Sequence, residues 1–234
     1  MTPSSVAAIV ASYLLGSIPA AYIAGKAKGI DLRKHGSGNL GATNVIRVLG
    51  TKIGIAVFAF DMAKGALPVA FFPRWVPLAD APMRDPMVLA LICGVAAIAG
   101  HVRPIYLLFG KGGKGVATAA GVFLALAPIQ TLLTLVIFAV VLLTSGFVSL
   151  GSLTSALVLP LLLGVTVGVR SPLFIISVVV AAFVFWTHRA NIERLRNGDE
   201  HRFGKKGVRA KRSIATLAIS LVIVAAVAVA ARFG

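Results

Sequence analysis

The run VATAAGVFLALAPIQTLLTLVIFAVVLL, residues Val116–Leu143, decides how the chain is threaded through a membrane. It is uncharged and longer than the roughly 20 residues that a helix needs to span the hydrocarbon core. A single crossing would place the segment from Arg189 to Arg212 outside, although it carries nine Lys and Arg against three acids. Pro128 resolves the conflict, because proline can end one helix and begin another. We therefore expect residues 116–127 to form a short span or a re-entrant helix, with a full span after Pro128.

Composition places the chain among integral membrane proteins. Of its 234 residues, 58% are hydrophobic and 13% are charged, which excludes an ordinary soluble domain. The expected fold is an all-α integral membrane protein, a compact bundle of about seven to eight transmembrane helices, some short or re-entrant, in a single domain of residues 1–234. The other apolar runs are Pro3–Gly25, Ile53–Phe72, Met87–Leu108, Leu150–Gly168, Ser171–Thr187 and Ser213–Ala231, the last an extra C-terminal helix.

Positive charge sets the expected orientation. The net charge of +16 comes from 23 Lys and Arg against seven acids, and much of the excess lies in segments between apolar runs. Residues 26–52 hold six Lys and Arg against Asp31, so we expect this segment on the cytoplasmic side and the N-terminus outside. Such clustering favours anionic lipid headgroups over nucleic acid. Cys93 is alone, which excludes a disulfide or a thiolate–metal framework.

Two charged residues interrupt the second apolar run. Asp61 and Lys64 are three residues apart and so share one helical face. A charge at the centre of a span costs roughly 2.5–3.5 kcal/mol, so both side chains should face protein or lie near an interface. An ion pair that locks helix packing explains them at least as well as a catalytic pair does.

Three polar motifs separate the apolar runs: GSGNLGATN at Gly36–Asn44, KGGKGVAT at Lys111–Thr118 and HRANIERLRNGDEHRF at His188–Phe203. Glycines, hydroxyls and nearby cations favour a phosphate, and a helix beginning near Val116 would offer its N-terminus to an anion. Neither glycine motif is a nucleotide site. Gly115 follows Lys114 where a P-loop has Ser or Thr, and no βαβ unit surrounds the first motif.

From Gly16 to about Phe203 the chain resembles the bacterial membrane glycerol-3-phosphate acyltransferases that use acyl phosphate, the PlsY family. The resemblance rests on the first two motifs and on H-x-x-N-I-x-R-L-x-x-G-x-E at His188–Glu200. It implies a phospholipid-biosynthesis enzyme that moves a fatty acyl group to the 1-position of sn-glycerol 3-phosphate, giving lysophosphatidic acid and phosphate. It further implies a multi-pass protein of the bacterial inner (plasma) membrane with a cytoplasmic active site. Neither cofactor, metal, nucleic acid nor obligate protein partner is expected.

The resemblance also implies roles for individual residues. The expected acceptor-binding residues are Ser37, Arg47, His188 and Asn191, with Ser37, His188 and Asn191 also expected to be catalytic. The expected residues for acyl phosphate are Gly38, Asn39, Gly41, Thr43, Asn44, Lys114 and Ser149. Simpler interpretations stay open. Arg47 and Lys114 can be topogenic charges, and Ser37 and Ser149 can be helix caps.

The residues suggest direct acyl transfer, because no nucleophilic triad is visible and so no acyl-enzyme is expected. Either His188 removes the acceptor proton, or the donor phosphate does so itself. His188 and Glu193 are five residues apart and do not face each other on a helix, so no dyad is expected. A transporter of a phosphate-bearing anion is the alternative function, favoured by the broken helix and the intramembrane charges. A structural protein that recruits anionic lipid is a third.

Overall fold

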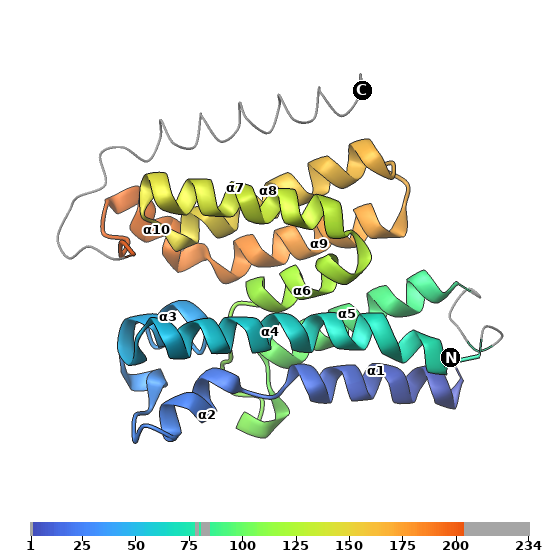
Figure 1. Cartoon of the computed structure of the whole chain (residues 1–234), viewed down its shortest axis with the longest axis horizontal. Coiled ribbons are helices and arrows are strands. Elements are labelled where there is room, and N and C mark those ends of the chain that lie inside the picture. Colours follow the sequence, from blue (N-terminus) through green and yellow to red (C-terminus); the bar gives the residue numbers. More distant parts are fainter. Residues whose placement is uncertain (1, 78–79, 81–84, 204–234) are drawn as a thin grey trace. The chain divides into compact units, whose positions relative to one another are not determined.

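The computed structural model describes residues 2–77, 80 and 85–203, and every regular element in these ranges is a helix. The chain divides into two compact units, unit 1 at Met1–Pro128 and unit 2 at Ile129–Gly234 (Figure 1). The expected all-α membrane fold is confirmed. The expected C-terminal helix at 213–231 lies outside the described residues.

Unit 1 contains six α-helices and three short 3-10 helices in its described part. The α-helices are α1 (Pro3–Gly16), α2 (Ala20–Lys26), α3 (Ala42–Leu49), α4 (Thr51–Phe71), α5 (Pro86–Val102) and α6 (Val116–Leu126). The 3-10 helices are η1 (Leu32–Lys34), η2 (Phe72–Trp75) and η5 (Ile105–Leu107).

The first span differs from the expected continuous helix, because it is broken between α1 and α2. Pro19 has no N–H to continue the ladder, and Ser17 ends α1 by donating from its backbone N–H to Tyr13 O at 2.9 Å. At the break, the carbonyl of Ile18 accepts from the backbone N–H of Ala20 at 3.1 Å and from Nζ of Lys64 at 2.8 Å. A buried cation thus adds a second donor to a backbone group for which lipid offers none.

Glycines let the helices of unit 1 approach closely. A Cβ added at Gly65 would collide with the Thr118 carbonyl, and one at Gly121 would collide with the carbonyl of Met62. These two contacts pack α4 directly on α6. On another side, a Cβ at Gly16 would strike the backbone of Ala97 on α5. Small residues at membrane helix interfaces allow this backbone contact, so bulkier residues would force the pairs apart.

The described part of unit 2, up to residue 203, contains four helices. They are α7, which begins at the unit boundary (Pro128–Ser145), α8 (Val148–Thr166), α9 (Pro172–Thr187) and α10 (Arg189–Asn197). One apolar core cluster joins α7 to α8 and consists of Ile137, Val141, Phe147, Leu150, Val158 and Leu162. The chain bends by 58° between α9 and α10. This bend places His188 at a junction between an apolar helix and a basic one.

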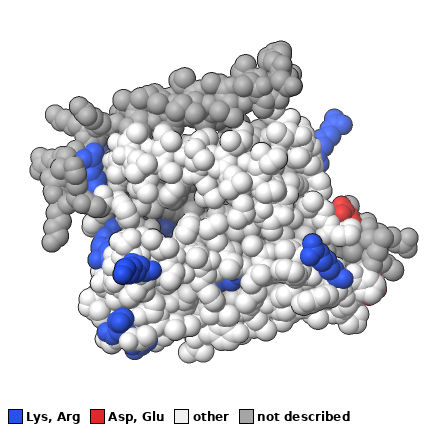
Figure 2. Space-filling model, in the orientation of Figure 1, with Lys and Arg blue, Asp and Glu red and all other residues white. Residues whose placement is uncertain are grey.

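The described residues contain five helical segments long and apolar enough to span a membrane, or six if α9 and α10 count as one bent span. The shorter apolar helix α6 has 11 residues, about 17 Å at the usual rise, which is less than the hydrocarbon thickness. The expected break at Pro128 is confirmed, since α6 ends at Leu126 and α7 begins at Pro128. Uncharged residues make up most of the face seen in Figure 2, as a membrane protein requires. The total of seven to eight helices stays a prediction.

Candidate active site

The amide of Asn44 holds the first glycine loop together. Asn44 is 1% exposed, and its Oδ1 accepts a hydrogen bond from the backbone N–H of Ser37 at 2.8 Å. Its Nδ2 donates to Leu32 O at 3.3 Å and to His35 O at 3.0 Å. Gly36 has φ +62°, and a Cβ there would collide with the Asn44 amide. Both amide hydrogens of Asn44 are thus committed to the loop backbone, which fixes the loop that displays Ser37.

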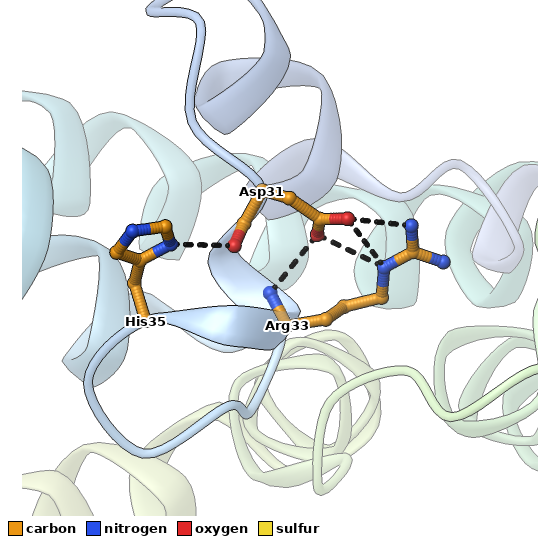
Figure 3. A network of polar contacts seen from close by, with 3 residues as sticks. All are labelled: Asp31, Arg33 and His35. Carbon is orange, nitrogen blue, oxygen red and sulfur yellow. Dashed lines mark hydrogen bonds and ion pairs between the residues drawn. The ribbon is translucent and has the colours of Figure 1, made fainter.

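A second brace lies just before this loop (Figure 3). The Asp31 carboxylate accepts from the backbone N–H of Arg33 at 3.1 Å and forms a bidentate pair with the Arg33 guanidinium, with Nη2 to Oδ2 at 2.7 Å. Nδ1 of His35 lies 2.9 Å from the Asp31 carbonyl. The hydrogen bond from Arg33 holds the pKa of the Asp31 carboxyl well below its usual range. The positive charge of Arg33 is therefore matched by Asp31, whereas no acid lies next to Arg47 in the sequence.

The loop ends at the N-terminus of α3. Gly41 is the N-cap, and its carbonyl accepts the N–H groups of Asn44 and Val45. The N–H groups of the first helical residues, Ala42 and Thr43, precede the first intrahelical bond and carry the positive end of the helix dipole. Arg47 lies exposed in the last turn of α3, and Ser37 is exposed in the loop. The sequence predicted no helix between residues 26 and 52, so α3 was not foreseen.

We predict that Asn44→Ala destabilises the protein, because the N–H of Ser37 loses its partner and the carbonyls of Leu32 and His35 each lose one of their two donors. Leaving buried polar groups unpaired costs about 1–3 kcal/mol. Thermal unfolding in detergent should show a lower Tm than wild type, with activity reduced at temperatures where the variant stays folded. Asn197→Ala, which truncates an exposed asparagine, is the control and should match wild type. An unchanged Tm for Asn44→Ala would contradict this role.

The second glycine loop, residues 111–115, is bound to the end of α5. Backbone N–H groups of Gly112 and Gly113 donate to Val102 O at 3.0 Å and to His101 O at 3.3 Å. A Cβ at Gly113 would lie 3.0 Å from the Leu40 carbonyl. The loop therefore touches the first motif at Leu40, so unit 1 brings the two glycine loops together.

Beyond this loop, α6 begins as expected at Val116, after Gly115 at φ +84°. Lys114 is half-buried just before that N-terminus. Two buried oxygens have no hydrogen-bond partner within the described structure: Oδ1 of Asn39 in the first motif and Oγ1 of Thr118 in the second. A buried polar group without a partner is costly and suits a place where a ligand supplies the partner.

In unit 2, the third motif places His188 at the start of α10. The ring is 4% exposed, and Nδ1 lies 2.8 Å from the Val184 carbonyl. A carbonyl only accepts, so Nδ1 carries the hydrogen, and the neutral ring has its lone pair on Nε2. The Val184 carbonyl therefore helps to orient this imidazole. Glu193 is exposed, in agreement with the expectation that the two residues form no dyad.

Glu200 is the centre of a second buried cluster in unit 2. Its Oε1 accepts from Oγ of Ser149 at 2.9 Å and from Nδ2 of Asn191 at 2.6 Å. Its Oε2 accepts from Nε of Arg194 at 2.7 Å. The sequence analysis quoted Glu200 in the motif without a role. This carboxylate, with three donors, therefore connects α10 to the start of α8. The hydroxyl hydrogen of Ser149 is used in the bond to Glu200.

We predict that Glu200→Gln destabilises this cluster. A glutamine amide would place an N–H group where a carboxylate oxygen now accepts, and the charge-assisted bond to Arg194 would be lost. Such a bond contributes roughly 1.5–3 kcal/mol. Thermal unfolding should therefore begin at lower temperature, whereas Glu193→Gln, at an exposed acid on α10, should behave as wild type. Equal Tm values for the two variants would rule out a stabilising role for the Glu200 carboxylate.

The expected site residues are divided between the two units. Ser37, Arg47 and Lys114 belong to unit 1, and Ser149, His188 and Asn191 belong to unit 2. Within unit 1 the two glycine loops meet, and within unit 2 Ser149 and Asn191 share Glu200. The signal for Glu200 was present in the motif, since an acid among basic residues needs a partner. No sequence signal pointed to the contact between Leu40 and Gly113.

Comparison with known proteins gives a consistent result. A sequence model of the family described as glycerol-3-phosphate acyltransferase matches residues 6–198. The glycerol-3-phosphate acyltransferase of Chlorobaculum tepidum is 42% identical over 227 residues, which covers 86% of this chain and 97% of that protein. The protein of the same name from Geobacter sulfurreducens is 45% identical, with 82% of this chain and 94% of the relative covered.

Solved structures agree with the sequence relatives. The crystal structure of PlsY (YgiH), an integral membrane glycerol 3-phosphate acyltransferase, in its glycerol 3-phosphate form has a TM-score of 0.77 and 39% identity, covering 86% of this chain and 96% of that one. The lysophosphatidic acid form of the same enzyme has a TM-score of 0.74 and 36% identity, covering 92% and 98%. The chain therefore belongs to the glycerol-3-phosphate acyltransferase family of integral membrane enzymes.

Proposed function

We propose that this chain transfers a fatty acyl group from acyl phosphate to the 1-position of sn-glycerol 3-phosphate, giving lysophosphatidic acid and inorganic phosphate. The observation that carries the proposal is the meeting of two glycine-rich, cation-bearing loops at Leu40 and Gly113, in a membrane enzyme of this family. Both substrates carry a phosphate, and one carries a long apolar chain. Backbone N–H groups, hydroxyls and cations beside apolar helices suit both.

The reaction balances without a covalent enzyme intermediate. The 1-hydroxyl oxygen attacks the acyl carbon, the bond from that carbon to the phosphate oxygen breaks, and phosphate leaves with the electron pair. The hydroxyl proton passes to the departing phosphate or to His188. Because acyl phosphate is already an activated mixed anhydride, positioning supplies much of the acceleration, and neither cofactor nor metal is needed.

We assign glycerol 3-phosphate to Ser37, Arg47, His188 and Asn191. The assignment for Arg47 is supported by its exposure and by its difference from Arg33, whose charge is matched by Asp31. Asn191 points its amide at Glu200, so we propose that Glu200 orients Asn191 toward the acceptor. Ser37, His188 and Asn191 are the residues that we place at the reacting hydroxyl.

The donor phosphate is assigned to Lys114 and to the first motif. Its oxygens would accept from backbone N–H groups at Gly41 and Thr43, near the N-terminus of α3, and from the Lys114 ammonium. The N–H of Gly38 donates to the His35 carbonyl at 3.1 Å and would have to be shared with the phosphate. The Asn39 oxygen, which has no partner in the described structure, accepts and would therefore need a donor such as water beside the phosphate. Asn44 acts through the loop that it braces, and Ser149 would have to release Glu200 before it could donate to a phosphate.

A phosphate-exchange experiment tests direct transfer. Purified protein is incubated with acyl phosphate and labelled inorganic phosphate, with and without glycerol 3-phosphate. Direct transfer predicts lysophosphatidic acid only when the acceptor is present, and no label in the acyl phosphate when it is absent. Labelled acyl phosphate formed without acceptor would demonstrate an acyl-enzyme and overturn this part of the proposal.

We further propose that the enzyme lies in the bacterial inner membrane with its N-terminus outside and its motifs on the cytoplasmic face. The basic segments support this orientation. A cysteine introduced at Asn197, an exposed residue of α10, should react with an impermeant thiol reagent only after the membrane is opened. The same cysteine in opened membranes is the control for reactivity. Labelling in intact cells would contradict the proposed orientation.

A further inference from the structure

Unit 1 buries a cluster of ionisable side chains that the proposed reaction does not use. Asp61 and Lys64 on α4 are each 2% exposed, and His101 in the last turn of α5 is 6% exposed. Nζ of Lys64 lies 2.8 Å from Oδ1 of Asp61, and Nδ1 of His101 lies 3.5 Å from the same oxygen. Two opposite charges inside a membrane bundle stabilise each other only if this geometry is kept.

The far edge of the His101 ring reaches the second glycine loop. A Cβ added at Gly113 would collide with Nε2 of His101 and would lie 2.6 Å from Cε1. The backbone carbonyl of His101 also accepts the N–H of Gly113. One residue therefore contacts the intramembrane carboxylate on one side and the loop before Lys114 on the other.

The other end of the cluster is fixed to the helix scaffold. Lys64 donates to the carbonyl of Ile18, at the break between α1 and α2. The next residue, Gly65, packs against the Thr118 carbonyl in the first turn of α6. The face of α4 that carries the ion pair thus touches the start of α6 as well as His101, so α4 positions both sides of the Lys114 segment.

We propose that Asp61, Lys64 and His101 form a positioning network that fixes the loop of residues 111–115, and through it the binding of the donor phosphate. These three residues do not touch substrate. The inference rests on the proposed function, since it assumes that this loop holds the phosphate of acyl phosphate. It explains why an ion pair is retained inside a span, where apolar side chains would pack at lower cost.

The test compares His101→Ala, His101→Gln and Cys93→Ala with wild type. Cys93 is a fully buried residue on the same helix and is not part of the network, so Cys93→Ala is the matched control. His101→Ala should raise the KM for acyl phosphate and the inhibition constant of inorganic phosphate about tenfold or more, with the KM for glycerol 3-phosphate unchanged. His101→Gln should restore part of the loss, because its amide can still donate to Asp61.

A second variant and a binding measurement complete the test. Gly113→Ala crowds the ring from the loop side and leaves the ion pair intact, so it should give the same donor-specific pattern even if His101→Ala fails to fold. Inorganic phosphate should raise the Tm of wild type but not of His101→Ala, and this readout needs no turnover. A wild type that binds phosphate but makes no lysophosphatidic acid would refute the proposed function alone. Equal changes in both KM values, or a lower Tm with unchanged constants, would overturn the network.

Discussion

Lys114→Ala is expected to raise the KM for acyl phosphate by about 10- to 150-fold while the KM for glycerol 3-phosphate stays near its wild-type value. The factor corresponds to loss of one charged contact, roughly 1.5–3 kcal/mol. The physical reason is the place of Lys114, half-buried directly before the N-terminus of α6, where an ammonium and a helix dipole act on one anion. Steady-state kinetics with each substrate varied in turn provide the measurement.

Arg47→Ala is the matched variant, because it removes one cation from the other glycine motif. It should raise the KM for glycerol 3-phosphate by a similar factor and leave acyl phosphate unaffected. Lys28→Ala serves as the control, since Lys28 is an exposed cation outside the glycine motif. If Lys114→Ala and Arg47→Ala damaged both substrates equally, the division of the two phosphates between the motifs would be wrong.

The second large effect is expected at His188. We propose that the imidazole anchors the acceptor, so His188→Gln should chiefly raise the KM for glycerol 3-phosphate and lower kcat less than tenfold. A general base would contribute about 10²- to 10⁴-fold to kcat. The structure supports an anchor because the Val184 carbonyl accepts from Nδ1 and fixes the direction of the ring.

A pH profile of kcat under saturating substrates separates the two roles. An anchor predicts that wild type and His188→Gln keep the same profile shape, because the proton passes to phosphate in both. A thousandfold fall in kcat with unchanged KM, together with disappearance of the acidic limb, would show that His188 takes the proton. Direct transfer would survive that result, but the role given to His188 would not.

Much of the fold follows from the sequence because the bilayer imposes simple requirements. Spans need about 20 apolar residues, and the run at Thr51–Phe71 was located within two residues from that rule. The charge bias of the later segments together with Pro128 predicted the short helix that the structure shows as α6. The intramembrane ion pair was also recognised from the spacing of Asp61 and Lys64, and the structure confirms it at 2.8 Å.

Other features depend on contacts between residues distant in sequence, which no local pattern encodes. The break at Ser17–Pro19 lies inside an apolar run and is stabilised by Lys64, 46 residues away from Ile18. Glu200 accepts a hydrogen bond from Ser149, which is 51 residues away in the sequence. The short helix α3 was missed because its glycine-rich approach reads as loop, although a buried Asn44 organises it. Polar residues in this chain were easier to assign to a ligand than to the loops that they brace.

The most direct test of the central claim supplies purified protein with sn-glycerol 3-phosphate and either a synthetic acyl phosphate or the corresponding acyl-CoA. Lysophosphatidic acid and inorganic phosphate are then followed in the same samples. We predict that acyl phosphate yields both products in equal amounts, with the acyl group at the 1-position, and that acyl-CoA yields neither. Lysophosphatidic acid formed from acyl-CoA, or none formed from acyl phosphate, would contradict the account.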